Sequence, residues 1–182
     1  MPIALVGLRC SGKSSAGKLL AERRARPFFD SDLELARRFG DGRSAGDLLA
    51  ELGEPAFRQL EWRTLVALLD SAEDAVIATG GGAVTNPLSR ELLGRRAFTV
   101  YLTAPPAVLR ARAEADETLR PTLMRAGRPL ELEDLLALRD PLYRSLAALV
   151  VETGDRAPAA IVSLIDTGLI EAELRNDRST GR

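Results

Sequence analysis

The feature that most restricts the fold of this chain is a glycine-rich motif near the N-terminus. Residues Gly7 to Ser14, called the phosphate loop below, read GLRCSGKS and match the pattern G-x-x-x-x-G-K-[ST]. The motif directly follows a short apolar run, Pro2 to Val6, and opens a segment of helical period, Lys13 to Arg24. Backbone N–H groups of such a loop and the positive end of the helix dipole bind nucleotide phosphates. A chance glycine-rich turn is the alternative, but the placement favours a phosphate-binding loop.

Beyond this loop, short apolar runs alternate with longer segments of helical period, which is typical of an α/β domain with a mainly parallel sheet. Strands are expected at Pro2 to Val6, Pro27 to Phe29, Ala75 to Ala78, Phe98 to Leu102 and Leu149 to Glu152. Helices are expected to begin near Lys13, Pro55, Pro105, Leu130 and Pro158. We therefore predict a three-layer α/β/α fold around a five-stranded, mainly parallel sheet.

Composition excludes several kinds of chemistry. The 182 residues include no His and one Cys, so His-based catalysis, His-ligated metals and internal disulfides are excluded. A formal net charge of -1 and 4% aromatic residues argue against a nucleic-acid binder. No apolar stretch approaches the roughly 18 residues of a membrane span, and nothing resembles a signal peptide. We expect a cytoplasmic monomer with one domain at residues 1–175 and a polar tail at 176–182.

The residue types of the phosphate loop assign its contacts. Lys13 is expected to reach the β and γ phosphates, and Ser14 to ligate Mg²⁺. Cys10 narrows the backbone conformations open to the loop, because a Cβ restricts φ and ψ. The further residues expected at the nucleotide are Gly7, Ser11, Gly12 and Ser15.

Two acids follow the second expected strand, at the edge of the sheet where ligands bind in doubly wound folds. We expect Asp30 to face the metal of the phosphate loop and Asp32 to face the hydroxyl of a phosphoryl acceptor. The alternative is that Asp30 or Ser31 merely caps a helix that starts near Leu33.

Three glycines, Gly80 to Gly82, follow the third expected strand and would let an acceptor lie against bare backbone. Alone, such a triplet is more often a flexible turn. Arg58 and Arg139 lie on expected helices, where a single arginine is usually a solvated surface charge.

The strings GLRCSGKSS, FFDSDLELARR, FRQLE, ATGGGAV, LRPTL, RDPLYR and TGDRAP occur in an order and spacing that resemble the shikimate kinase family. The resemblance extends from Ile3 to about Leu169. It implies a fold of the P-loop kinase type, with ATP and shikimate as small-molecule substrates and Mg²⁺ as cofactor. The implied reaction phosphorylates the 3-hydroxyl of shikimate to shikimate 3-phosphate, in chorismate and aromatic amino acid biosynthesis.

The resemblance also implies roles for the acceptor-side residues. Arg58 and Arg139 would hold the shikimate carboxylate, and Glu61 would orient Arg58. Asp32 would accept hydrogen bonds from the ring hydroxyls and act as positioning group or base. Gly80, Gly81 and Gly82 would line the acceptor, and Phe57, Leu49 and Pro121 would form an apolar wall.

A mobile lid near residues 112–125 is implied in the same way. Within it, Arg120 would bind ATP and join Lys13 in stabilising the charge of the transferred phosphoryl group. Arg110 and Arg156 match the adenine-binding region of the family, although Arg112 is close enough to Arg110 to be the residue that stacks on the base.

Two alternatives to this function stay open from the sequence. A related kinase of the same fold would phosphorylate gluconate or a nucleoside monophosphate. A catalytically silent ATP-binding regulator is the other alternative, and its only support is Cys10 in the phosphate loop.

Overall fold

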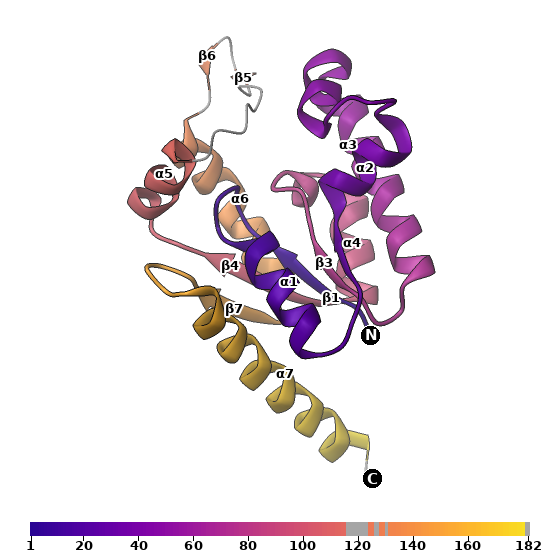
Figure 1. The fold of residues 1–182 in the computed structure, drawn as a ribbon, viewed down its shortest axis with the longest axis vertical. Helices are drawn as coiled ribbons and strands as arrows, with labels where there is room; N and C mark the ends of the chain where they lie inside the picture. The colour runs from indigo at the N-terminus through magenta and orange to yellow at the C-terminus, as the bar shows by residue number, and fades with distance from the viewer. Residues whose placement is uncertain (116–123, 126–127, 130, 181–182) are drawn as a thin grey trace.

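The computed structural model describes residues 1–115, 124–125, 128–129 and 131–180 (Figure 1). The strands are β1 (Ile3–Val6), β2 (Phe28–Asp30), β3 (Val76–Ala78), β4 (Phe98–Thr103), β5 (Met124–Arg125), β6 (Arg128–Pro129) and β7 (Leu149–Glu152). The helices are α1 (Lys13–Arg23), α2 (Ser31–Phe39), α3 (Ala45–Ser71), the 3₁₀ turn η1 (Ala83–Thr85), α4 (Pro87–Arg96), α5 (Pro106–Glu114), α6 (Leu132–Leu146) and α7 (Pro158–Thr180).

The main sheet has five parallel strands in the order β2-β3-β1-β4-β7, which confirms the predicted fold class. Strand β1 lies at its centre, where Leu5 pairs with Ala78 of β3 and Val100 of β4. Its sequence, IALV, is apolar throughout because both faces of a central parallel strand are covered. All five strands match the runs expected from the sequence to within about two residues.

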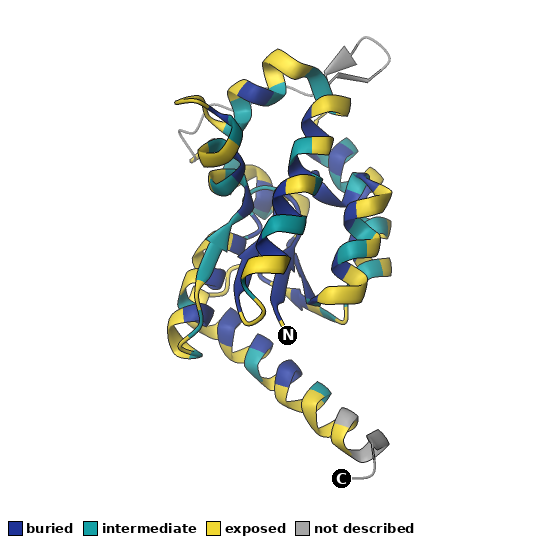
Figure 2. Ribbon diagram, turned by 90° about the vertical axis from the view of Figure 1, so that its right-hand side faces the viewer, coloured by how far each residue is buried: buried dark blue, intermediate teal, exposed yellow. Residues whose placement is uncertain are grey.

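Helices cover both faces of this sheet (Figure 2). On one face, α1 and α7 pack on the strands through Leu20, Ile161 and Ile165. On the other, α3, α4 and α6 pack through Leu65, Leu93 and Tyr143. Burial of these two apolar layers is the main force that holds the sheet between its helices.

Several elements differ from the sequence-based expectations. Helix α2, capped by the Asp30 carboxylate, is the helix near Leu33 that the sequence offered with the alternative role of Asp30, and it begins at Ser31. Helix α4, capped by the Asn86 side chain, was not among the expected helices. Helix α3 starts before Pro55 and is interrupted at Gly53, whose φ is 74°. Helix α7 continues to Thr180, so most of the expected polar tail is helical.

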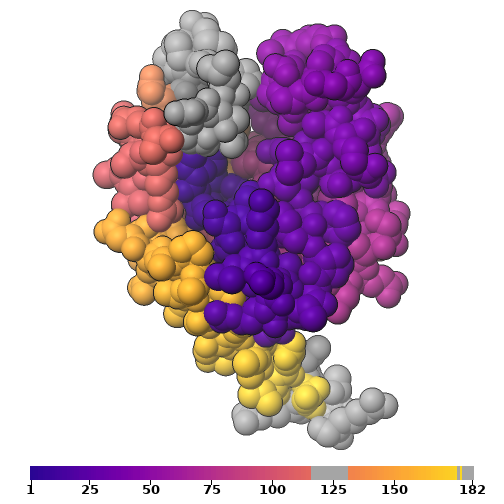
Figure 3. Space-filling view, viewed as in Figure 1, coloured from indigo at the N-terminus to yellow at the C-terminus, as the bar shows by residue number. Residues whose placement is uncertain are grey.

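Parallel strands bring their carboxyl ends to one edge of the sheet, and the chain leaves β1 toward β2 on one side before returning to β4 on the other. The phosphate loop lies at this switch point, where ligands bind in open α/β sheets. Figure 3 shows a hollow on this face between α5 and the tips of α2 and α3, with atoms of the N-terminal segment at its floor. No described helix is both long and apolar enough to cross a membrane.

Candidate active site

The phosphate loop has a backbone that glycine makes possible at two positions. Gly7 has a φ of 146°, and a Cβ there would lie 2.4 Å from the carbonyl oxygen of Leu102. Gly12 has a φ of 93° and is the N-cap of α1. Both conformations are open to glycine and strained for other residues, so the two fixed glycines of the motif shape the loop.

Cys10 adopts a left-handed conformation, with a φ of 63°. This conformation costs a residue with a Cβ of the order of 1 kcal/mol relative to glycine. Cys10 therefore does restrict the loop as expected from the sequence, because its backbone is held in a strained conformation. The carbonyl of Cys10 accepts a hydrogen bond of 3.3 Å from Nη1 of Arg112.

Lys13 lies over the phosphate loop and is almost buried. Its Nζ donates to the carbonyl oxygens of Gly7, at 3.0 Å, and Leu8, at 2.8 Å. The ammonium group is thus held at the loop by the loop's own backbone, close to where a β or γ phosphate would be bound.

Ser14 and Asp30 meet at the start of α1, where the Ser14 hydroxyl donates to Oδ2 of Asp30 at 2.7 Å. The other carboxylate oxygen of Asp30 caps α2 by accepting from the N–H groups of Asp32, at 3.1 Å, and Leu33, at 3.4 Å. Asp30 therefore caps the helix and also reaches the phosphate loop. A hydroxyl and a carboxylate oxygen side by side are ligands that suit Mg²⁺.

The glycine turn, Gly80 to Gly82, is shaped by charged side chains of the protein itself. A Cβ on Gly80 would lie 2.5 Å from a carboxylate oxygen of Asp32 and 2.5 Å from one of Glu61. A Cβ on Gly82 would lie 2.2 Å from Nη2 of Arg58. The N–H of Gly80 donates to the buried Ser31 hydroxyl at 2.8 Å. The turn is therefore pinned, and its missing side chains make room for two carboxylates and a guanidinium.

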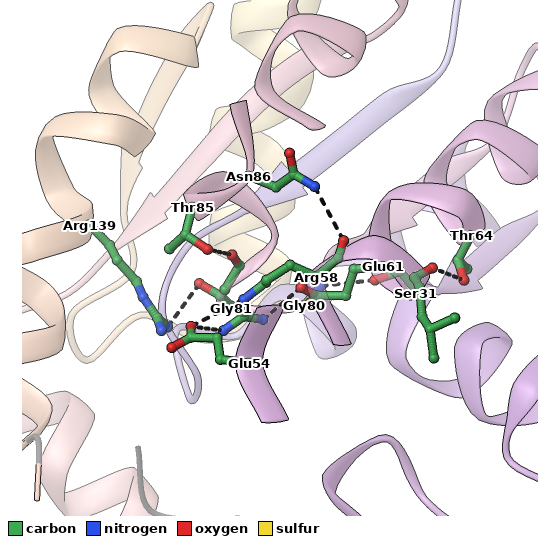
Figure 4. Close-up of polar contacts among 12 residues, drawn as sticks. Ser31, Glu54, Arg58, Glu61, Thr64, Gly80, Gly81, Thr85, Asn86 and Arg139 are labelled. Carbon is green, nitrogen blue, oxygen red and sulfur yellow. Dashed lines mark hydrogen bonds and ion pairs between the residues drawn. The ribbon is translucent and has the colours of Figure 1, made fainter. Parts of the chain in front are cut away.

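Arg58 is buried and bound by carboxylates on both sides (Figure 4). Its Nη1 donates to Glu61 at 2.6 Å, and its Nη2 donates to Glu54 at 2.6 Å. The side-chain amide of Asn86 donates to the Arg58 carbonyl at 3.3 Å, which joins the start of α4 to α3. These contacts fix the guanidinium beside the glycine turn.

Arg139 reaches the same turn from α6, on the opposite side (Figure 4). It is 7% exposed, and its Nη1 donates to the carbonyl of Gly81 at 3.2 Å. Burial lowers the pKa of this guanidinium, which nonetheless stays charged because the ordinary pKa of arginine is so high. The structure thus brings Asp32, Arg58, Arg139 and the three glycines together, although they are far apart in the sequence.

Burial also perturbs Glu61, which is 4% exposed. Removal from water raises the pKa of Glu61 to about 7, against the opposing attraction of Arg58. Burial opposes the charge on Arg58 as well, but the carboxylates of Glu61 and Glu54 hold its pKa above the ordinary value. Glu61 and the Arg58 guanidinium therefore share a site that is largely closed to water, whereas Glu54, the other partner of Arg58, is 43% exposed.

The residues expected at the adenine side are less closely grouped. The exposed Arg110 pairs with Glu133, and it makes no hydrogen bond to the described residues of the phosphate loop. Arg112 instead donates to Cys10, to the Thr153 hydroxyl at 3.2 Å and to the Gly154 carbonyl. Arg156 is exposed in the turn after β7. Arg120, Pro121 and most of the expected lid lie outside the described residues.

Four residues of the site were not expected from the sequence: Ser31 as a contact of the glycine turn, and Glu54, Asn86 and Tyr143. Glu54 and Tyr143 lie one helical turn from Arg58 and Arg139, so helical spacing could have indicated them. The contacts of Ser31 and Asn86 join distant segments and leave no local signal.

Comparison with known proteins supports the same interpretation. The family model described as "Shikimate kinase" matches residues 9–167. The shikimate kinase of Burkholderia thailandensis is 40% identical over 164 residues, which cover 90% of this chain and 86% of that protein. The shikimate kinase of Pseudomonas fluorescens is 41% identical over 160 residues, covering 88% and 91%. A solved structure of shikimate kinase from Acinetobacter baumannii in complex with shikimate is 36% identical, with a TM-score of 0.85, and covers 95% of this chain and 94% of that one.

Proposed function

The chain belongs to the shikimate kinase family, and from this premise we propose that it transfers the γ-phosphoryl group of ATP to the 3-hydroxyl of shikimate. The observation that carries the proposal is the pair of buried guanidiniums, Arg58 and Arg139, that meet at the glycine turn. A planar guanidinium suits a carboxylate, because it donates two parallel hydrogen bonds. Shikimate carries one carboxylate on a hydroxylated ring.

The two arginines differ in how far their guanidinium groups are already bound by carboxylates of the protein. Arg58 already donates from Nε, Nη1 and Nη2 to Glu54 and Glu61. Arg139 donates through Nη1 to the Gly81 carbonyl and also interacts with the Tyr143 side chain, but among the described residues it forms no ion pair with a carboxylate, so it can donate to a ligand. We propose that Arg139 supplies the first contact and that the acceptor carboxylate displaces Glu54, the more exposed partner of Arg58.

Asp32 is proposed to receive the acceptor hydroxyl. One of its carboxylate oxygens approaches Gly80 of the glycine turn, beside Glu61. In this position it would orient the hydroxyl and accept its proton as phosphoryl transfer proceeds.

Lys13 and the phosphate loop are proposed to bind the triphosphate. Phosphoryl transfer passes through a loose transition state in which charge builds on the equatorial oxygens, so cations placed at those oxygens lower the barrier. Lys13, whose ammonium group lies at the phosphate loop, is proposed as one of these cations. We propose Arg120, which lies outside the described residues, as the second.

We propose Mg²⁺ as the cofactor, held by the Ser14 hydroxyl and the Asp30 carboxylate. These two oxygens fit the small number of protein ligands that Mg²⁺ takes when phosphates and water complete its shell. When bound, the ion would neutralise charge on the β and γ phosphates.

For the adenine side, we propose Arg112 in preference to Arg110. Arg112 already joins the phosphate loop to the turn after β7, through Cys10, Thr153 and Gly154. The nearby Arg156 is proposed as a second contact. A monomeric state and a cytoplasmic location stay predictions from the sequence.

An ADP-release assay with shikimate, gluconate and nucleoside monophosphates as separate acceptors tests the function. We expect turnover with shikimate and Mg²⁺ that disappears when EDTA is added. Turnover confined to gluconate or a nucleotide would contradict the acceptor, and ATP binding with no acceptor-dependent ADP would indicate a silent regulator.

A further inference from the structure

Two tyrosines form a stacked pair beneath the acceptor side of the site. Tyr101 of β4 and Tyr143 of α6 have ring centroids 4.8 Å apart, and both residues are fully buried. They are the only tyrosines of the chain. A buried hydroxyl needs a hydrogen-bond partner, so the partner of each ring shows what the pair holds in place.

The two hydroxyls bind different parts of the molecule. Tyr101 donates to Oδ1 of Asp140 at 2.8 Å, which ties β4 to α6. Tyr143 donates to the carbonyl of Gly81 at 2.5 Å, which ties α6 to the glycine turn. Burial raises the pKa of Tyr143 far above its ordinary value, so this hydroxyl keeps its proton and stays a donor.

The carbonyl of Gly81 is also the hydrogen-bond acceptor of Arg139. Tyr143 and Arg139 lie one helical turn apart on α6 and donate to the same oxygen, with Tyr143 at the shorter distance. If the tyrosine hydroxyl were removed, Arg139 would be the remaining described donor to this half-buried carbonyl. It would then be drawn toward Gly81, because its charged guanidinium would be the strongest described donor left beside that oxygen.

We infer that the Tyr143 hydroxyl is a positioning residue for the acceptor: by binding Gly81 it holds the glycine turn and leaves Arg139 available for the acceptor carboxylate. The inference rests on the proposed function, since it assigns Tyr143 to the same acceptor site. Tyr143 acts through Arg139 and the turn and makes no contact with the reacting atoms.

The test compares Tyr143→Phe with Tyr101→Phe, which removes the same hydroxyl from the other ring of the same stack. Loss of one neutral hydrogen bond corresponds to roughly a three- to tenfold effect. We expect Tyr143→Phe to raise the KM for shikimate by about this factor, with kcat and the KM for ATP within about twofold of wild type. Tyr101→Phe should lower the melting temperature and leave the KM for shikimate unchanged.

A double variant separates positioning from general damage. If Tyr143 acts through Arg139, Tyr143→Phe should change the KM for shikimate much less in an Arg139→Lys background, because the two effects are then coupled. An unchanged KM in Tyr143→Phe, equal changes in both tyrosine variants, or full additivity with Arg139→Lys would each overturn the inference.

A spectroscopic measurement keeps the inference testable if Tyr143→Phe does not fold. In Tyr101→Phe, incorporation of 3-fluorotyrosine labels Tyr143 alone, so its ¹⁹F resonance reports on the hydroxyl at Gly81. We expect the resonance to shift at saturating shikimate and to shift less with ADP, and no shift with shikimate would count against the inference. If the wild-type enzyme shows no shikimate-dependent turnover, the proposed function is overturned as well. If the wild type is active and Tyr143→Phe has an unchanged KM for shikimate, this inference alone is overturned.

Discussion

The two halves of the site are built in different ways. The proposed nucleotide side is one contiguous stretch, Gly7 to Ser14, which offers its backbone and the first turn of α1. Asp30 of β2 lies beside it and accepts a hydrogen bond from Ser14. The acceptor side collects Asp32, Arg58, the glycine turn and Arg139 from four separate segments. Backbone N–H groups at a helix start suit any phosphate, whereas the proposed acceptor contacts depend on the side chains of particular residues.

This difference predicts that substitutions on the acceptor side change turnover or acceptor binding and spare ATP. The largest effect is expected for Asp32→Asn, which keeps the size of the side chain and removes its capacity to accept a proton. Loss of a positioned base lowers rates by about 10²- to 10⁴-fold, so kcat should fall by that factor. We expect the ATP dissociation constant, measured by titration, to stay unchanged while kcat falls, which would separate the nucleotide side from the acceptor side. A kcat within about threefold of wild type would contradict the role of Asp32 as a base.

The buried carboxyl of Glu61 gives the acceptor side a dependence on pH. Burial raises the pKa of Glu61 from 4.5 to about 7, so between these values the folded protein holds a proton that the unfolded chain releases. The free energy of unfolding should therefore fall as the pH rises through this range, by up to about 3 kcal/mol relative to Glu61→Gln, and the loss should be complete above about pH 7.

Urea unfolding of wild type and Glu61→Gln between pH 4.5 and 8 measures this dependence. Groups distant from Glu61 titrate alike in both proteins, so the difference between the two curves reports on Glu61 and the charges it contacts. Parallel curves would mean that the carboxyl does not carry a raised pKa.

Arg139→Ala tests the guanidinium that is less neutralised by the protein. Loss of charge-assisted hydrogen bonds costs about 1.5–3 kcal/mol, which corresponds to roughly a ten- to hundredfold rise in the KM for shikimate. Arg144→Ala, on the same helix, is the control, because Arg144 is 54% exposed and pairs with Asp140 at the surface. Steady-state kinetics in which both variants behave alike would remove Arg139 from the acceptor site.

Gly82→Ala tests whether the glycine turn makes room for Arg58. The new Cβ would lie 2.2 Å from Nη2 of a guanidinium that Glu54 and Glu61 hold in place. We expect the KM for shikimate to rise about tenfold as Arg58 is displaced, the loss of one charge-assisted contact. In Gly94→Ala the Cβ meets only Leu146 at 3.4 Å, so kinetics should not change. Equal kinetics for the two variants would show that Arg58 accommodates a side chain at position 82.

The smallest effect is expected in the phosphate loop, for Cys10→Gly. Glycine relieves the left-handed strain at this position but loses more entropy on folding, so stability should change by less than about 1 kcal/mol. Because the loop binds phosphate through its backbone, the KM for ATP should change by less than about threefold. A larger change in this KM would mean that the Cys10 side chain contributes to nucleotide binding.

The sequence predicted the local features of this molecule well. The five strands of the parallel sheet follow from apolar runs, and the phosphate loop follows from a motif that contains its own turn and helix start. The pairing of Glu61 with Arg58 was also expected, because residues three apart on a helix are neighbours. The kink at Gly53 and the helix α4 were missed, because α4 is only 10 residues long and its sequence shows no clear apolar stripe.

Other properties depend on contacts between distant segments, and only the tertiary structure decided them. The double use of Asp30, the preference for Arg112 at the phosphate loop and the shared acceptor of Arg139 and Tyr143 each join segments that the sequence separates. By itself, the sequence determined which chemical groups the protein has and how each short segment folds. Packing the segments together determined which charges are buried side by side, because burial and distance set the strength of an electrostatic interaction.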